Sequence, residues 1–135
     1  MDPQLDKKTG FYRQLGKIKS CFLGFEDHGI FTFWLEVDYG GCCQSVGARV
    51  LSYRDEKSLP GALDFIIRII KACGVRSWDQ VAGRTVYFLW SSEKPWNMSP
   101  LGIQNLEIDP GELFLFEEVN ERVKKLEDLL RTTQG

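Results

Sequence analysis

The stretch VDYGGCCQSVG, from Val37 to Gly47, gathers residue types that could do chemistry at close range. Its glycines would let a ligand approach the backbone and would offer it N–H groups. Gln44 adds an amide that both donates and accepts hydrogen bonds, so it could recognise the edge of a base or another amide. The same residues suit a glycine-rich β-turn with a bulge, and the local sequence leaves both interpretations open.

A ligand at this stretch would need charge and a stacking surface from elsewhere in the chain. The stretch lacks the lysine of G-x-x-x-x-G-K-[ST] and does not open a helix, so it is no phosphate loop of a known kind. Arginines could supply phosphate contacts. We therefore predict a ligand site with two groups of members. The first is the glycine loop with its arginines: Tyr39, Gly40, Gly41, Gln44, Gly47, Arg49, Arg54 and Arg84.

The second group supplies aromatic stacking and contacts to a base edge. The chain is rich in aromatic residues, with nine Phe, four Trp and four Tyr. A ring that stacks on a base, beside an amide that reads the base's edge, would make a nucleotide site. The candidates are Phe88, Trp90, Trp96 and Asn97. The alternative is that these rings belong to the core and to a hydrophobic patch for a partner.

Other reactive side chains give no complete catalytic motif. Cys42 and Cys43 are neighbours and form no C-x-x-C pair, so we expect no metal. His28, the only histidine, lies in a turn at the opposite end of a strand, about 30 Å from the cysteines at roughly 3.3 Å per residue. Glu36 and Asp38 share one strand face and could serve acid–base or magnesium chemistry. No third ligand accompanies them, so we predict a protein that is not an enzyme and has no cofactor.

Composition favours a globular protein inside the cell. The chain has 135 residues, which suits one domain with a sizeable core. It contains no apolar run long enough to cross a bilayer and no signal peptide, so we expect a soluble, cytoplasmic protein without a membrane partner. A net charge of −2 makes nucleic acid an unlikely partner through bulk charge.

Periodicity predicts an α+β fold: an antiparallel β-meander or sheet of about five strands, one buried central helix and a C-terminal helix. We expect a basic flexible arm over residues 1–16, an α+β core domain over 17–111 and a helix over 112–135. That helix could lie on its own sheet or join a second subunit through a heptad-like seam. Strands are expected at 17–26, 29–39, 44–53, 84–91 and 101–108, and the buried helix at 59–73.

Several motifs resemble those of a family of small phage and prophage proteins. The family shows E-D-H-G-x-x-T, then D-Y-G-G-x-x-Q-x-x-G, then G-V-x-S-W-[ED] and G-[KR]. Here these correspond to Glu26, Asp27, His28, Gly29 and Thr32, to Asp38, Tyr39, Gly40, Gly41, Gln44 and Gly47, and to Gly74, Val75, Ser77, Trp78, Asp79, Gly83 and Arg84. The resemblance covers residues 17–116. Cys42 and Cys43 stand where the family has small residues, and Ala48 stands where it has a second glycine.

The resemblance implies a counter-defence role like that of the Thoeris anti-defence sponge proteins, which hold a nucleotide signal without cleaving it. It implies a homo-oligomer that sequesters a cyclic ADP-ribose-type molecule or a cyclic oligonucleotide in the host bacterial cell. An alternative is an anti-CRISPR-type inhibitor that contacts a host defence protein complex. A third is a small metal-dependent nuclease or phosphodiesterase built on Glu36 and Asp38.

Overall fold

The computed structural model describes residues 3–29, 31–47, 52–53, 59–95, 98–106, 113–117 and 129. Its elements follow one another as β1 (Gln4–Leu5), β2 (Tyr12–Phe25), β3 (Phe31–Asp38), β4 (Cys43–Val46), β5 (Ser52–Tyr53), α1 (Leu59–Ala72), a 3-10 turn η2 (Trp78–Gln80), β6 (Thr85–Trp90), β7 (Gly102–Gln104) and β8 (Leu113–Leu115).

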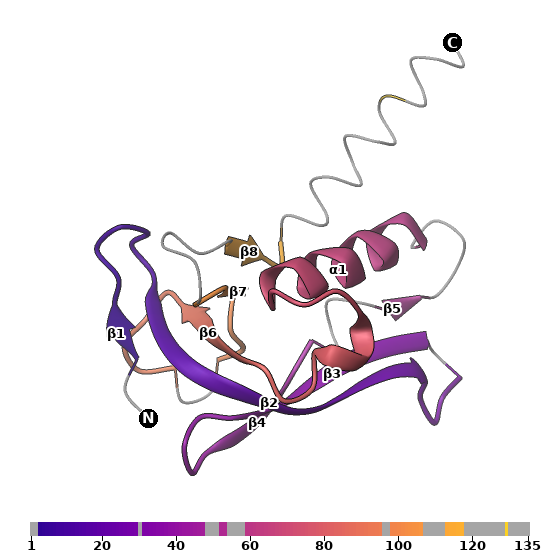
Figure 1. Ribbon diagram of the computed structural model, residues 1–135, viewed down its shortest axis with the longest axis horizontal. Helices are drawn as coiled ribbons and strands as arrows, with labels where there is room; N and C mark the ends of the chain where they lie inside the picture. The colour runs from indigo at the N-terminus through magenta and orange to yellow at the C-terminus, as the bar shows by residue number, and fades with distance from the viewer. Residues whose placement is uncertain are drawn as a thin grey trace.

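The described strands form one antiparallel sheet of eight strands in the order β4-β3-β2-β6-β7-β8, with β1 paired to β2 and β5 paired to β3 (Figure 1). The α+β class and the meander β2-β3-β4 are confirmed. The expected number of about five strands was too low, because short strands are added at the sheet's margins. The expected strand over 44–53 is two strands, β4 and β5, which pair with different parts of β3.

The sheet buries one face under α1, and alternation along β3 decides which side chains lie there. Phe33, Leu35 and Val37 are fully buried, whereas Trp34 and Glu36 on the opposite face are partly exposed. Successive side chains of a strand point to opposite faces, so this pattern follows from the sequence alone. Phe33 meets Phe65 of α1 at 4.7 Å between ring centroids, which joins the helix to the sheet.

The helix α1, Leu59–Ala72, nearly coincides with the predicted range 59–73. It is not the buried central helix that we expected. Phe65 and Ile69 are fully buried, while Leu63 is 59% exposed and Ile67 is 43% exposed. A helix lying on one face of a single sheet can bury only one side, and Figure 1 shows α1 in that position. The helix has 14 residues, and no helix in the described part of the chain is long and apolar enough to span a bilayer.

The C-terminal helix predicted from residue 112 does not begin there. Leu113–Leu115 form β8, which pairs with β7 and extends the sheet beyond the predicted core boundary. Phe116, taken as the first residue of a heptad-like seam, instead packs with Phe65 and Phe114 at 5.4 Å from each. The apolar spacing at this point serves the core of the same chain. The rest of the seam, Val119, Val123, Leu126 and Leu130, lies outside the described residues, and Leu129, which is described, is helical.

The region predicted as a basic arm, residues 1–16, contains β1 and the first residues of β2. β2 begins at Tyr12, and residues 12–17 pair with β6 from Trp90 to Thr85. β1 then pairs with the start of β2, Gln4 opposite Arg13 and Leu5 opposite Tyr12. The lysines of this region suggested a solvated tail, but the alternation that continues from Lys17 back to Tyr12 brings it into the sheet. Residues of this region, among them Arg13 and Leu15, line a hollow beside β2.

Candidate functional site

The glycine turn between β3 and β4 directs its backbone donors at its own carboxylate. The N–H groups of Gly40 and Gly41 donate to Asp38 Oδ1 at 2.8 and 3.1 Å. Both glycines have positive φ, 95° and 116°, which other residues rarely adopt. The hydrogen bond from Gly41, followed by that from Gly40, lowers the pKa of the Asp38 carboxyl. The donors that we predicted for a ligand are therefore engaged within the turn.

Gln44 also has protein partners on both ends of its amide. Its Oε1 accepts a hydrogen bond from the Tyr39 hydroxyl at 2.9 Å. Its Nε2 donates to the carbonyl of Met98 at 3.0 Å, and Trp90 Nε1 donates to the same carbonyl at 3.4 Å. This network links the glycine turn to the loop that follows β6. Gln44 thus forms a hydrogen bond with a peptide group, as its side chain allows, but that peptide group is the Met98 carbonyl of the same chain.

The aromatic residues near the turn are packed against one another. The Tyr39 ring lies 5.6 Å from Phe88 and 5.4 Å from Trp90, between centroids. Phe88 and Trp90 are fully buried and offer no ring face to a ligand. Burial, followed by the proximity of Cys42, raises the pKa of the Tyr39 hydroxyl above its ordinary range. Four residues of the predicted site are thus brought together, as a closed network rather than as the wall of an open pocket.

Two further described residues of the predicted site, Gly47 and Arg84, make other contacts. Gly47 packs against Phe33, and a Cβ built on it would lie 2.5 Å from the Phe33 ring. Arg84 Nε donates to the carbonyl of Cys73 at 3.0 Å, beyond the end of α1. Four further members fall outside the described residues: Arg49, Arg54, Trp96 and Asn97.

Two other reactive groups, Glu36 and His28, have hydrogen-bond partners within the chain. Glu36 Oε1 accepts a hydrogen bond from Ser45 Oγ at 2.6 Å. His28 Nδ1 lies 3.0 Å from Glu26 Oε2, and this hydrogen bond raises the pKa of His28. Burial raises the pKa of the Cys73 thiol to about 12. Within the described ranges, no three His, Cys, Asp or Glu side chains are grouped so as to hold a metal ion.

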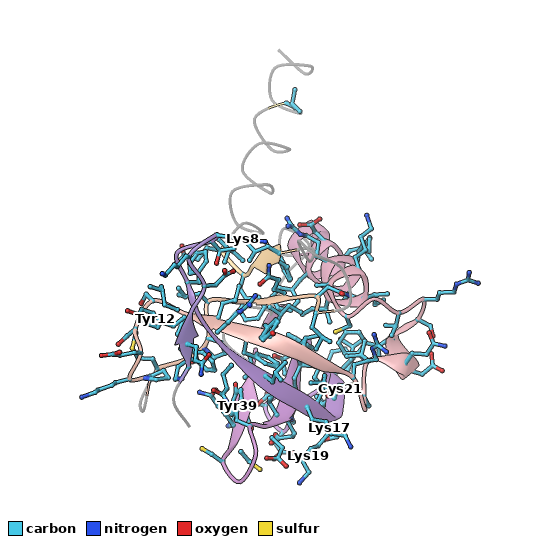
Figure 2. The ribbon with its side chains drawn as sticks, turned by 60° about the vertical axis from the view of Figure 1, so that its left-hand side comes forward. Lys8, Tyr12, Lys17, Lys19, Cys21 and Tyr39 are labelled. Carbon is cyan, nitrogen blue, oxygen red and sulfur yellow. The ribbon has the colours of Figure 1, made fainter. Side chains whose placement is uncertain are left out.

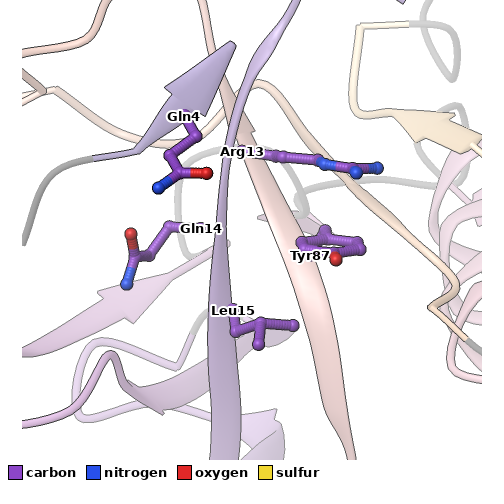
Figure 3. A pocket seen from close by; sticks show the side chains of 5 residues that line it. All are labelled: Gln4, Arg13, Gln14, Leu15 and Tyr87. Atoms are coloured by element: carbon purple, nitrogen blue, oxygen red, sulfur yellow. The ribbon is translucent and has the colours of Figure 1, made fainter. Parts of the chain in front are cut away.

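A hollow of about 290 Å³ lies beside the first half of β2, on residues that the sequence did not single out. It is small for a ligand pocket, where about 300–1,000 Å³ is usual. Figure 3 shows Arg13 and Tyr87 on one side of the β2 ribbon and Gln4 and Gln14 on the other. Leu15, which is 48% exposed, completes the lining. The hollow therefore combines a cation, an aromatic ring, two amides and an apolar side chain.

Arg13 is held in place within this hollow. Its guanidinium carbon lies 4.2 Å from the centre of the Tyr87 ring, and its Nη1 lies 3.6 Å from Asp6 Oδ2. Asp6 in turn accepts hydrogen bonds from the Lys8 N–H and the Thr9 hydroxyl at 3.1 and 3.0 Å. Burial by itself would raise the pKa of the Asp6 carboxyl. The hydrogen bonds from Lys8 and Thr9, together with the charge of Arg13, outweigh this effect and lower the pKa of Asp6. The Arg13 side chain is still 34% exposed and can contact a ligand.

The outward face of β2 continues this positive charge. Arg13 and Leu15 are followed at alternate positions by Lys17, which is exposed. Figure 2 shows Lys17 and Lys19 further along β2. The sequence signal for this arrangement was the alternation Arg13, Leu15, Lys17 against buried Gly16 and Ile18. It was missed because residues 1–16 were interpreted as an arm.

Comparison with protein-family models, curated protein sequences and solved structures finds no match for this chain.

Proposed function

We propose that the protein binds a nucleotide second messenger, of the cyclic ADP-ribose type or a cyclic oligonucleotide, and holds it without cleaving it. The motifs that resemble phage proteins suggest that this serves counter-defence in a host bacterial cytoplasm. The observation that carries the binding proposal is the hollow around Arg13. Its lining offers the groups that a nucleotide needs: charge for a phosphate, a ring beside the base, and amides for polar edges.

The hollow supports this proposal better than the glycine turn does. In the turn, the Asp38 carboxylate takes the N–H groups and Met98 takes the Gln44 amide. In the hollow, Arg13 is fixed by Tyr87 and Asp6 yet partly exposed. A side chain fixed before binding loses less entropy when a ligand arrives. We therefore place the nucleotide against β2 rather than in the VDYGGCCQSVG turn.

Calorimetric titration with cyclic ADP-ribose and cyclic di-AMP tests the proposal. We expect Arg13→Ala to weaken binding by roughly 10- to 100-fold, because a hydrogen bond to a charged group contributes about 1.5–3 kcal/mol. Lys71→Ala is the control, since it removes the same charge from an exposed position on α1. Absence of heat with either nucleotide would contradict the proposal.

Chromatography of the same mixtures tests whether the ligand is only held. After long incubation with magnesium or manganese, heat denaturation should release the nucleotide unchanged. Release of a cleaved product would favour the nuclease or phosphodiesterase alternative. In that case Glu36→Gln and Asp38→Asn would be the first variants to assay, because these carboxylates share one strand face.

A second candidate function is inhibition of a host defence complex, such as a CRISPR effector, by protein contact. Leu63 and Ile67, one helical turn apart on α1, are 59% and 43% exposed, and such apolar pairs suit a partner surface. Leu63→Lys should then abolish inhibition of target cleavage by the purified effector. Leu106→Lys, at a 40% exposed apolar position outside the helix, should not. An effector that remains fully active in excess protein would eliminate this candidate.

Assembly into a homo-oligomer is also part of the proposal. The exposed apolar side chains on α1 could meet their equivalents in a second copy. Native mass spectrometry reads the oligomer mass and any retained nucleotide together. A monomer at every concentration tested would remove assembly from the proposal without affecting the binding hollow.

A further inference from the structure

One flank of β2 lacks a described strand partner over a short interval. β1 pairs with β2 at Tyr12 and Arg13, and β3 begins to pair with β2 at Lys17. Beyond Asp38 the chain cannot continue this pairing, because it turns at Gly40. The opposite flank of β2 is paired with β6 throughout this interval. This flank, which has no partner among the described residues over the interval, lies at the hollow lined by Gln4, Gln14 and Leu15.

The hydrogen-bond pattern shows which backbone groups face that flank. Ile18 directs both its N–H and its C=O toward β6, to the Arg84 carbonyl at 2.8 Å and the Gly83 N–H at 2.6 Å. On β6, the carbonyl of Leu89 points the other way, to the N–H of Leu101 at 2.7 Å. Hydrogen-bonded and non-hydrogen-bonded pairs alternate along an antiparallel ladder. Both observations therefore assign the even-numbered residues of this part of β2 to the β6 side.

Leu15 consequently faces away from β6, with its N–H and C=O toward that flank. Its cross-strand neighbour Tyr87 is a non-hydrogen-bonded partner, whereas Gln14 and Gly16 bond to β6. No described residue lies opposite Leu15 on the other side. Gln4 and Gln14 stand beside this point, and Leu15 itself lines the hollow (Figure 3). We call the Leu15 N–H and C=O, with the two flanking amides, the β2 notch.

We propose that the β2 notch recognises the polar edge of the ligand's base, a step that rests on the proposed nucleotide-binding function. In extended backbone, the N–H and C=O of one residue point the same way and offer a donor beside an acceptor. A nucleobase edge such as that of adenine presents the complementary pair, an exocyclic N–H next to a ring nitrogen. The notch would therefore read a base edge with two main-chain hydrogen bonds.

The size and charge of the notch favour a single base over an added peptide strand. From Arg13 to Lys17 the strand rises about 13 Å, at roughly 3.3 Å per residue. Within that length, only Leu15 directs a donor and an acceptor toward this flank without a partner among the described residues, so a peptide could form a single ladder pair before meeting β1 or β3. Arg13 and Lys17 lie on either side of Leu15 on the outward face, where they could contact a phosphate.

Amide hydrogen exchange followed by NMR tests whether the notch is open in the free protein. The Leu15 N–H should exchange rapidly, while those of Gln14 and Gly16, bonded to β6, should exchange at least 100-fold more slowly. These neighbours are internal controls in the same sample. Addition of AMP as the probe should slow exchange at Leu15 and shift its amide resonance. A Leu15 N–H that is protected before any ligand is added would overturn the inference.

Leu15→Pro tests the donor without removing a ladder hydrogen bond. Proline is tolerated where a strand N–H faces away from its partner. We expect Leu15→Pro to weaken AMP binding at least tenfold. Leu15→Ala, which keeps the N–H, should change binding less than threefold. Equal effects of the two variants would overturn the notch. Circular dichroism and the thermal midpoint verify folding, and if Leu15→Pro does not fold, the exchange measurement decides.

A matched ligand tests the same contact from the other side. N6,N6-dimethyl-AMP lacks the exocyclic donor, and we expect it to bind at least tenfold more weakly than AMP. Equal binding of the two ligands, with Arg13→Ala still weakening both, would overturn the notch but leave the proposed function intact. No binding of AMP, cyclic ADP-ribose or cyclic di-AMP to the wild-type protein would instead remove the proposed function itself.

Discussion

The glycine turn after β3 and the hollow beside β2 contain similar chemical groups in opposite states. Each has a glutamine amide, a tyrosine ring and backbone N–H groups. In the turn, Gln44 bonds Tyr39 and Met98, and Asp38 takes the glycine donors. In the hollow, Gln14 lines open space, and the Leu15 N–H faces a flank without a described strand. Residue types that suit a ligand are thus used for folding in one region and left accessible in the other.

The comparison explains why a motif rich in glycine and amide side chains is weak support for a binding site. Tight turns need the same residues, because positive φ favours glycine and unpaired backbone groups need partners. What distinguishes the two regions is whether their glutamine amides and backbone N–H groups have partners in the described part of the chain. We therefore expect substitutions in the glycine turn to change folding stability and substitutions in the hollow to change ligand affinity.

The largest expected effect lies on the closed side, at Gly47. Gly47→Ala would place a Cβ 2.5 Å from the buried Phe33 ring at a φ of 114°. We expect a loss of about 3 kcal/mol in the free energy of unfolding, from overpacking together with an unfavourable φ. Gly40→Ala is the matched control: φ is also positive there, but no atom lies within 4 Å of the added Cβ. Urea denaturation should show a cost of about 1 kcal/mol for the control.

A matched pair of glutamine substitutions compares the two regions directly. Gln44→Leu leaves the buried Tyr39 hydroxyl without its acceptor, so we expect it to lose about 1–2 kcal/mol of stability. Nucleotide affinity should not change. Gln14→Leu should alter stability by less than about 0.5 kcal/mol, as is usual away from buried contacts, and should weaken nucleotide binding several-fold. If Gln44→Leu weakened nucleotide binding and Gln14→Leu did not, the ligand would instead bind at the glycine turn.

Removing a single hydroxyl gives a smaller contrast. Tyr39→Phe deletes the donor to Gln44 while keeping the ring between Phe88 and Trp90, and should cost about 1 kcal/mol of stability. Tyr87→Phe keeps the ring face beneath Arg13 and should leave stability nearly unchanged. Thermal unfolding of the two variants measures the difference. Equal losses would mean that the two tyrosines are held in the same way.

The smallest expected effect is a pH dependence of the glycine turn. Because folding lowers the pKa of Asp38 from its ordinary 3.8, its contribution is fully present above that value. The contribution is lost as the pH falls through the lower folded pKa. NMR titration should therefore shift the amide signals of Gly40 and Gly41 only in strong acid. Asp38→Asn should abolish this shift, and a titration midpoint above 4 in the wild type would contradict the prediction.

Much of the fold followed from local patterns, but several boundaries did not. The hairpin of β3 with the second half of β2, the strand β6 and the helix α1 lie where periodicity placed them. The apolar spacing around Phe116 suits a helix seam equally well, and only its contacts with Phe65 and Phe114 assign it to the core. Short apolar runs do not distinguish strand from helix without their partners.

Of the predicted ligand site, the sequence anticipated which residues gather but not whether they remain accessible. Tyr39, Gln44, Phe88 and Trp90 do meet. Their closure depends on the Met98 carbonyl, which is 54 residues from Gln44 along the chain. Arg13 and Tyr87 were missed because their contact requires β2 to extend through Tyr12 and to pair with β6. Such long-range partners leave no local periodic signal.

The sequence by itself determined the faces of the strands and the places of the turns, because side-chain alternation and glycine φ preferences act over a few residues. Only the tertiary structure decided which polar groups have hydrogen-bond partners within the chain and which stay accessible to a ligand. The pairing of β2 with β1, β3 and β6 leaves one interval beside Leu15 without a described partner. Hydrogen bonds join groups that are distant in the chain, so accessibility is a property of the assembled sheet.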